Sequence, residues 1–203
     1  MDCAELQKRD LAEVKTIRTE RLRLAPVTVH NANALWNVLQ APDLRTYQDL
    51  PNVGSSTFTA MVGKRPRRLL PGCVGRFEWL VYLNRTRKPM GWVSLRISAR
   101  ETPAAEIGYS IMREFRGRGF AREAVRALVH EGFCEAHIDR ISAYVMPENV
   151  ASRRLLEHLG FSDGGMVRKG ASIGGSPVDV RVFHLRKKDW AASPKSIEIP
   201  AFA

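Results

Sequence analysis

The chain has 203 residues, enough for one domain with a sizeable core, and its 44% hydrophobic and 26% charged residues are ordinary for a folded domain. Its 32 Lys and Arg against 21 Asp and Glu give a net charge of +11, which favours an anionic partner such as RNA, a ribosomal surface or a phosphate-rich cofactor. No stretch is apolar enough to span a membrane, and the charged N-terminus does not fit a signal peptide, so we expect a cytoplasmic protein without membrane contact. Cys3, Cys73 and Cys134 are too widely spaced for a disulfide framework or a zinc site, and we predict no metal.

In the first part of the chain the sequence predicts several elements clearly, and in one region its secondary-structure signal is weak. A short polar helix is expected over residues 2–16. The alternation of polar and apolar residues over 21–26 predicts a strand, and the apolar spacing over 30–40 predicts a helix. Proline and glycine interrupt any period over 43–75, where we predict only a helix at 57–65 and otherwise loop.

Three strands in sequence then predict an antiparallel meander, at residues 78–83, 90–97 and 105–111. A helix follows from Ala121 to Glu135, because apolar residues recur there at the spacing of an amphipathic helix. The next strand, at 140–146, completes a strand–helix–strand crossover, which implies parallel or splayed neighbours.

The loop that leads into the long helix has the composition of an anion site. It consists of Arg116-Gly117-Arg118-Gly119-Phe120-Ala121. The first N–H groups of a helix have no acceptor within the helix, glycines let a backbone approach a phosphate closely, and arginines add positive potential. The loop is not a Walker A loop, since no GxxxxGK[ST] occurs, and it is not GxGxxG, since Arg122 stands at the last position. An ordinary strand-to-helix turn with solvated arginines remains the alternative.

A second helix with clear start and stop residues completes the predicted core. Asn149 is a good residue to cap a helix, and Gly160 stands where a left-handed residue ends one. Beyond it, residues 161–169 and 178–185 predict a final hairpin around the glycine-rich residues 170–175.

Two segments in this order resemble the GCN5-related N-acetyltransferase (GNAT) superfamily, and within it the branch that acetylates the N-termini of ribosomal proteins and similar amines. Residues 116–121 are similar to the family's Arg/Gln-x-x-Gly-x-Gly/Ala loop after a Gly-Tyr strand, and Asn149-x-x-Ser152, continuing to Leu159-Gly160-Phe161, is similar to its second motif. The likeness covers about residues 19–190, between an N-terminal extension over 1–18 and a tail over 191–203. It implies an α/β (α+β) fold, with a mixed, mostly antiparallel sheet that is splayed between two central strands and has helices on both faces.

The resemblance also implies a cofactor, acetyl-coenzyme A, wedged into the splay. The loop backbone would hold its pyrophosphate, and the strand backbone near Tyr109 and Ser110 would bind the pantetheine arm and polarise the thioester carbonyl. Asn149 is implied as a contact of this arm, although a plain helix cap explains it equally well. The implied cofactor-binding residues are Ile111, Met112, Arg116, Gly117, Arg118, Gly119, Phe120, Ala121, Asn149 and Ser152.

Acetyl transfer by direct attack of an amine requires a neutral amine, a stabilised oxyanion and a proton for the leaving thiolate. An α-amine titrates near pH 8 and needs little help from a base, whereas a lysine needs more. Many family members supply the proton from a Tyr seven residues after the Asn, but Leu156 stands at that position here. The resemblance to the ribosomal-protein branch makes Ser152 the candidate acid, with a first-turn serine bonded to backbone as the alternative.

The sequence likewise does not decide which residue acts as the general base. Some family members use a Glu on the strand before the Asn, and Tyr144 is the corresponding residue here. Glu106 and Tyr109 remain as catalytic candidates acting through water, with Asp179 as a weaker one. Glu106 is also explained as a solvated residue at a strand edge.

The expected function is therefore acetyl-coenzyme A-dependent N-acetylation of a primary amine, either a protein N-terminus or a small molecule. The alternative, motivated by Leu156 and the net charge, is a non-catalytic coenzyme A-binding or ribosome/RNA-associated module on the same fold. Because no aromatic-interleaved basic patch occurs, we expect no direct nucleic acid binding. A homodimer remains open.

Overall fold

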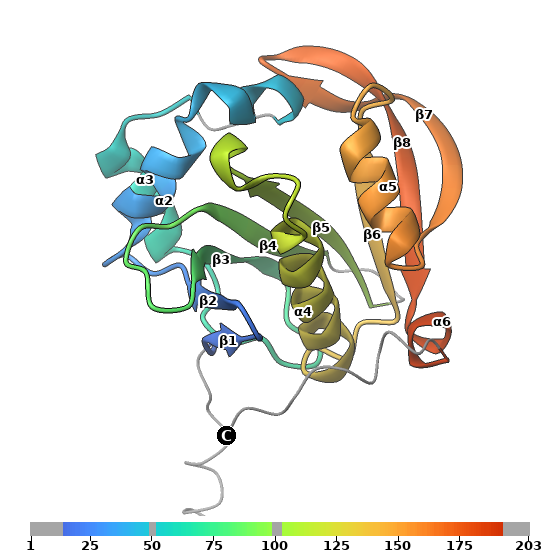
Figure 1. Cartoon of the computed structure of the whole chain (residues 1–203), viewed down its shortest axis with the longest axis horizontal. Helices are drawn as coiled ribbons and strands as arrows, with labels where there is room; N and C mark the ends of the chain where they lie inside the picture. Colours follow the sequence, from blue (N-terminus) through green and yellow to red (C-terminus); the bar gives the residue numbers. More distant parts are fainter. Residues whose placement is uncertain (1–13, 49–51, 99–102, 193–203) are drawn as a thin grey trace, which may run out of the picture.

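The computed structural model describes residues 14–48, 52–98 and 103–192 (Figure 1). Within these ranges, eight strands form one sheet in the order β1-β2-β3-β4-β5-β6-β8-β7. The strands are β1 (Ile17–Arg18), β2 (Leu22–Pro26), β3 (Gly75–Leu83), β4 (Gly91–Ser98), β5 (Ala104–Ile111), β6 (Arg140–Val145), β7 (Ser162–Ile173) and β8 (Ser176–Arg186). Every neighbouring pair is antiparallel except β5 and β6, which are parallel. The mixed, mostly antiparallel sheet predicted from the sequence is confirmed.

Helices cover both faces of this sheet, as expected. One face packs on α4 (Phe120–Cys134) and α5 (Val150–His158) through the odd-numbered residues of the central strands, such as Val93 and Ile107. The other face packs on α2 (Ala32–Leu39) and α3 (Ser55–Gly63) through even-numbered residues, such as Leu80 and Trp92. This division follows from the period of two in a strand, which sends successive side chains to opposite faces. Figure 1 shows α2 and α3 together at one end of the sheet and α5 at the other.

The parallel pair is splayed. Strands β5 and β6 are paired only from Ala104↔Arg140 to Glu106↔Ser142. Beyond these residues β5 continues to Ile111 against β4, and β6 continues to Val145 against β8. The sheet therefore opens between its two central strands, as the family resemblance implied, and α4 makes the connection between them.

Several elements lie outside the sequence-based expectations. Short 3₁₀ segments occupy η1 (Pro42–Tyr47) and η2 (Arg113–Phe115), and a last helix, α6 (Lys187–Ala191), follows β8. Strand β1 belongs to the sheet although it falls within the predicted extension. The final hairpin turns tightly at Gly174 and Gly175, both with positive φ, so its strands run well into the segment predicted as a wide glycine-rich loop.

The predicted helix over 2–16 lies outside the described residues for all but its last few positions, and most of the predicted tail lies outside them as well. Among the described helices, none is both long and apolar enough to cross a membrane.

Candidate active site

Two cavities meet at the splay, one on each face of the sheet. The first, about 690 Å³, lies on the side of α4 and α5 and is lined by the 116–121 loop, the end of β5 and the first turn of α5. The second, about 710 Å³, opens toward α2 and α3 and is lined by β3, β4, β5, β6 and the β7–β8 hairpin. Both are lined by Tyr47, Gln48, Tyr109, Asn149 and Ser152. Groups bound in the two cavities would therefore meet at these five residues.

The loop before α4 has the backbone geometry of an anion site. Gly117 and Gly119 have φ of 74° and 80°, a left-handed conformation that side chains with a Cβ disfavour. Gly119 is the N-cap of α4 and provides no side-chain cap for the first N–H groups of the helix, whose residues line the cavity. Arg116 and Arg122 line the cavity beside them. This arrangement fits a bound diphosphate, because N–H groups, helix dipole and guanidinium charge all favour an anion there.

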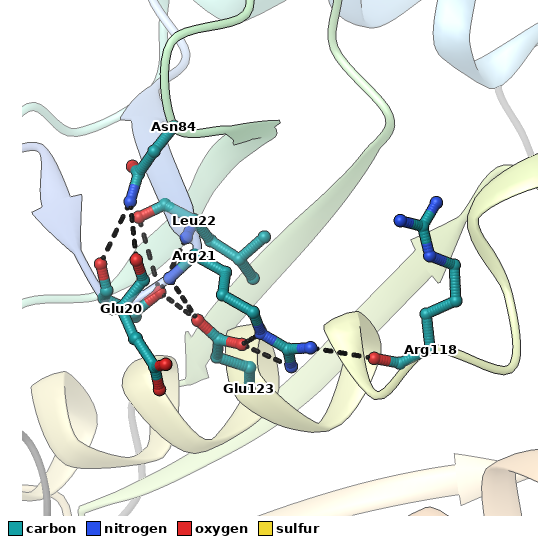
Figure 2. A network of polar contacts seen from close by, with 7 residues as sticks. Glu20, Arg21, Leu22, Asn84, Arg118 and Glu123 are labelled. Atoms are coloured by element: carbon teal, nitrogen blue, oxygen red, sulfur yellow. Dashed lines mark hydrogen bonds and ion pairs between the residues drawn. The ribbon is translucent and has the colours of Figure 1, made fainter.

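A polar network fixes this loop to the rest of the domain (Figure 2). The Glu123 carboxylate accepts hydrogen bonds from Thr19 Oγ1 at 2.5 Å, Arg21 N at 3.0 Å and Arg21 Nε at 2.6 Å. Arg21 also donates to the Arg118 carbonyl at 3.1 Å, and its guanidinium lies over the Phe120 ring. Asn84 holds the same β1–β2 turn by donating to the Glu20 carbonyl at 2.9 Å. Glu123, in the first turn of α4, thus anchors the loop.

Two of the catalytic candidates from the sequence, Tyr109 and Ser152, come together at the junction of the cavities. Tyr109 Oη and Ser152 Oγ are 2.6 Å apart, a short hydrogen bond in which either hydroxyl can donate. Burial raises the pKa of Tyr109 to about 12, against a smaller lowering by the Ser152 hydrogen bond. Tyr109 is therefore a neutral phenol at physiological pH, which suits an acid and does not suit the base role considered from the sequence.

The Tyr109 phenol also lies close to the turn of α5 that precedes Leu156. That leucine is fully buried in the core and follows Ser152 by one helical turn, on the same face of α5. Tyr109, projecting from β5, therefore brings a hydroxyl to the side of α5 on which Leu156 lies. Sequence reasoning could not find this pair, because the two residues are 43 positions apart.

The other predicted residues divide between the two cavities. Asn149 caps α5, since its Oδ1 accepts from Ser152 N at 3.1 Å, and it also lines both cavities. Glu106 and Tyr144 line the cleft on the α2–α3 side. Asp179 lines neither cavity and instead accepts a hydrogen bond from Lys169 N at 2.8 Å.

Most of the predicted cofactor residues line the cavity on the α4–α5 side, namely Ile111, Arg116, Gly117, Gly119, Phe120, Ala121, Asn149 and Ser152. Met112 and Arg118 do not line it. Met112 packs with the core near α2, and the Arg118 guanidinium lies over the Phe120 ring at 5.0 Å. Figure 2 shows the Arg118 side chain extending away from the Glu123 network, so its contribution to this network is its carbonyl.

The backbone at the open edge of β5 is not entirely free, in contrast to the expectation from the sequence. The Tyr109 carbonyl accepts a hydrogen bond from Gln48 Nε2 at 3.2 Å, and the Ile111 carbonyl accepts one from Arg116 Nε at 2.8 Å. Gln48 and Tyr47 come from the region in which the sequence has no regular pattern. Arg154 and His158 of α5 also line the cavity; they are four residues apart and therefore share a helix face, a spacing from which the sequence could have paired them.

Comparison with known proteins defines the class. The family described as "Acetyltransferase (GNAT) domain" matches residues 21–162, more than half of the chain, so the protein belongs to the GNAT family of acetyltransferases. It is an N-acetyltransferase, and the members of this family use acetyl-coenzyme A.

Particular relatives agree with this assignment. The chain is 32% identical over 179 residues to a protein of Bacillus licheniformis named "Uncharacterized N-acetyltransferase p20", covering 88% of this chain and 99% of the relative. Its fold is similar to that of the ribosomal-protein-S5-alanine acetyltransferase from Vibrio fischeri, with a TM-score of 0.73 and 21% identity over 87% of this chain and 99% of the other. Mycobacterium smegmatis RimJ, solved in complex with CoA-disulfide, has a TM-score of 0.72 and 19% identity over 91% of this chain and 92% of that chain.

Proposed function

We propose that this N-acetyltransferase binds acetyl-coenzyme A in the α4–α5 cavity and acetylates a primary amine that enters through the α2–α3 cleft. The observation that carries the proposal is the Tyr109–Ser152 hydrogen bond of 2.6 Å at the junction of the two cavities. Acetyl-coenzyme A would supply an acetyl thioester, the group that the amine attacks. An amine acceptor on one face and an acyl donor on the other then meet at a pair of hydroxyls.

The cofactor site is proposed from the residues that line the first cavity. Backbone N–H groups of residues 117–121 would hold the pyrophosphate, and the nearby Arg116, Arg122 and Arg154 add positive charge. Val150 and Leu155 give part of the same cavity an apolar wall, which fits the pantetheine arm. A cavity with one basic end and one apolar wall matches the two halves of this cofactor.

In the reaction, Tyr109 and Ser152 would deliver the proton that the departing thiolate needs. The raised pKa keeps the phenol protonated, and the short hydrogen bond lets the proton be replaced through the serine hydroxyl. Glu106, on the acceptor side of the junction, would accept the proton of the amine through water. An α-amine requires little of such help, because it is substantially neutral near pH 8.

The V. fischeri protein similar in fold is named for a ribosomal-protein alanine substrate, so a peptide N-terminus is the first acceptor class to test. A location in the cytoplasm and a homodimer remain predictions. The alternative of a non-catalytic module requires coenzyme A binding without turnover of any amine.

The test combines turnover with a matched pair of glycine variants. Release of free coenzyme A thiol from acetyl-coenzyme A is measured over a panel of N-terminal peptides and small amines, together with acetyl-coenzyme A affinity by calorimetry. Gly117 and Gly72 have similar φ, 74° and 78°, and an added Cβ meets nothing within 4 Å at either position. Gly117→Asp places a carboxylate at the proposed phosphate site, and Gly72→Asp introduces the same backbone strain away from the cavity.

We expect Gly117→Asp to weaken acetyl-coenzyme A binding at least about tenfold, equivalent to about 1.4 kcal/mol, and Gly72→Asp to leave it within about twofold. Equal affinities in the two variants would show that the cofactor phosphates bind elsewhere. Tight binding with no thiol release for any amine would favour the non-catalytic module.

A further inference from the structure

The cleft on the α2–α3 side contains charged side chains in a fixed cross-strand row. Strands β3, β4 and β5 place Arg76 opposite Arg96 and Arg96 opposite Glu106. The next row on the same face is Glu78, Ser94 and Gly108. Directly opposite residues on one sheet face have Cβ atoms about 5 Å apart, so these groups act on one another and on anything bound above them.

The buried part of this cluster consists of ion pairs among its own residues. Glu78 has a side chain that is 2% exposed, and its carboxylate pairs with both Arg65 and Arg76, the latter through a 2.8 Å hydrogen bond from Nε. Two guanidinium groups around one carboxylate leave a positive charge uncompensated. Burial and the neighbouring Arg76 lower the pKa of Arg65 to about 10, which still leaves it charged at neutral pH.

The outer part of the cluster is open to solvent and loosely paired. Arg96 and Glu106 approach only to 3.8 Å, and their side chains are 67% and 44% exposed. An exposed pair at this distance contributes little to stability, so a ligand can replace it at small cost. The half-exposed Arg76 lies beside them, in line with Arg96 across the strands.

The charged residues that line the cleft in the described part of the chain are thus three arginines and two glutamates, Arg65, Arg76, Arg96, Glu78 and Glu106. We propose that the acceptor carries a carboxylate close to its amine, and that Arg76 and Arg96 bind this carboxylate while the amine reaches the Tyr109–Ser152 pair. The inference rests on the proposed function in taking this cleft as the acceptor site.

Complementarity extends to both ends of such an acceptor. Guanidinium groups match carboxylates in geometry and charge, and often bind them through two parallel hydrogen bonds. Glu106, adjacent to Arg96, offers a negative group to the arriving ammonium. Adjacent positive and negative groups suit an amine and a carboxylate held a few ångströms apart, as in an amino acid or in a peptide with an acidic residue near its N-terminus. A polyamine or an aminoglycoside has no group for the arginines and meets the excess positive charge.

Matched acceptors test the proposal. One arm compares peptides that differ only in Asp or Asn at the second position, and another compares a free amino acid with its amide; spermidine represents the polycations. For the wild-type protein we expect kcat/KM at least about tenfold higher for the acidic member of one of the pairs, the factor that corresponds to about 1.4 kcal/mol. The pair that shows the difference identifies a peptide or a metabolite as the source of the carboxylate.

Variants assign the preference to the cleft. Arg76→Gln and Arg96→Gln should bring the acidic-to-neutral ratio of kcat/KM close to one, mainly by raising KM for the acidic acceptor. Arg23→Gln is the matched control, because Arg23 lies on the same sheet face, over the Tyr82 ring, and does not line the cleft. Its acidic-to-neutral ratio should stay at the wild-type value.

Equal kcat/KM for acidic and neutral acceptors, or a preference for spermidine, would overturn the inference and leave the acetyltransferase assignment intact. If no acceptor is turned over, binding of the same peptides in the presence of coenzyme A is measured by calorimetry. Tighter binding of the acidic peptide that is lost in Arg96→Gln would support the anion site and refute the proposed catalysis. Equal binding of both peptides would refute the anion site.

Discussion

The Tyr109→Phe variant isolates the group on which the proposed proton transfer depends. It removes one oxygen atom from a partly buried side chain and leaves the ring in place. The lost hydrogen bond to Ser152 is short, 2.6 Å, but it joins two neutral hydroxyls, so we expect a cost of about 1 kcal/mol in the free energy of unfolding. The ring packing against the core is retained, and the fold should persist.

The expected effect on turnover is much larger. Positioned acid catalysis commonly contributes a factor of about 100 or more, and Phe cannot donate a proton, so kcat should fall by about that factor. The KM for acetyl-coenzyme A should change little, because the phenol is proposed to act on the leaving group and not to hold the cofactor. Steady-state thiol release with a saturating amine measures both constants.

A double-mutant cycle with Ser152→Ala then tests whether the two hydroxyls act as one unit. If the proton passes along the pair, the Tyr109→Phe/Ser152→Ala variant should be no slower than the slower single variant, since groups that act together are strongly non-additive. A Tyr109→Phe variant with kcat within about twofold of wild type would refute the assignment of this pair as the acid. Multiplicative losses would mean that the two hydroxyls act separately.

Three further predictions concern stability. Because burial raises the pKa of Tyr109 from its ordinary 10.0 to about 12, the folded state retains a proton that the unfolded state loses, so the free energy of unfolding should fall above pH 10 by about 1.4 kcal/mol per pH unit from this group. The difference in unfolding free energy between wild type and Tyr109→Phe, measured by urea unfolding at pH 9 and 10.5, should shift by about 0.8 kcal/mol in favour of Tyr109→Phe, because the phenol of the unfolded state is only partly ionised over this interval; a constant difference would contradict the raised pKa. Glu123→Gln weakens a partly buried ion pair with Arg21 and should cost about 1–2 kcal/mol, whereas Asp189→Asn, in the exposed pair with Arg186, should cost less than about 0.5 kcal/mol. Trp190 is only 4% exposed and packs against Phe133, so Trp190→Ala leaves a cavity there and should lower the free energy of unfolding by roughly 3–5 kcal/mol. Thermal unfolding close to that of wild type would show that α6 is dispensable for stability.

The sequence predicts the loop and helix of the proposed donor side because these elements are local. The loop at 116–121 and the helix after it are contiguous, and glycine spacing, arginine content and helical periodicity all act within a few residues. The same holds for the cap at Asn149, whose partner Ser152 is three residues away. For the splay between β5 and β6, in contrast, the strand–helix–strand crossover left parallel or splayed neighbours open, and the family resemblance implied the splay.

The acceptor side depends on contacts between distant residues, which no local pattern encodes. The row of Arg76, Arg96 and Glu106 exists only through the register of three strands, and a shift by one residue would send every one of these side chains to the other face. Likewise, Gln48 reaches Tyr109 from a segment without regular period, 61 positions earlier in the chain. Helix α6 is short and charged, and only the burial of Trp190 reveals its role.

The distribution of positive charge links these two sides. The net charge of +11 favoured an anionic partner but did not choose among RNA, a ribosomal surface and a cofactor. In the folded protein, arginines gather at two separate places: Arg116, Arg122 and Arg154 line the cavity beside the helix N-terminus, and Arg65, Arg76 and Arg96 line the cleft on the opposite face.

Each cluster suits a different anion because each has a different neighbourhood. The first lies beside backbone N–H groups and an apolar wall, which fits a diphosphate attached to a long, mostly apolar arm. The second lies among glutamates on a flat row of strands, which fits a single carboxylate next to an amine. Tyr109 and Ser152 line both cavities where they meet, so the two anionic molecules would be held apart by the sheet and brought together only at their reactive ends.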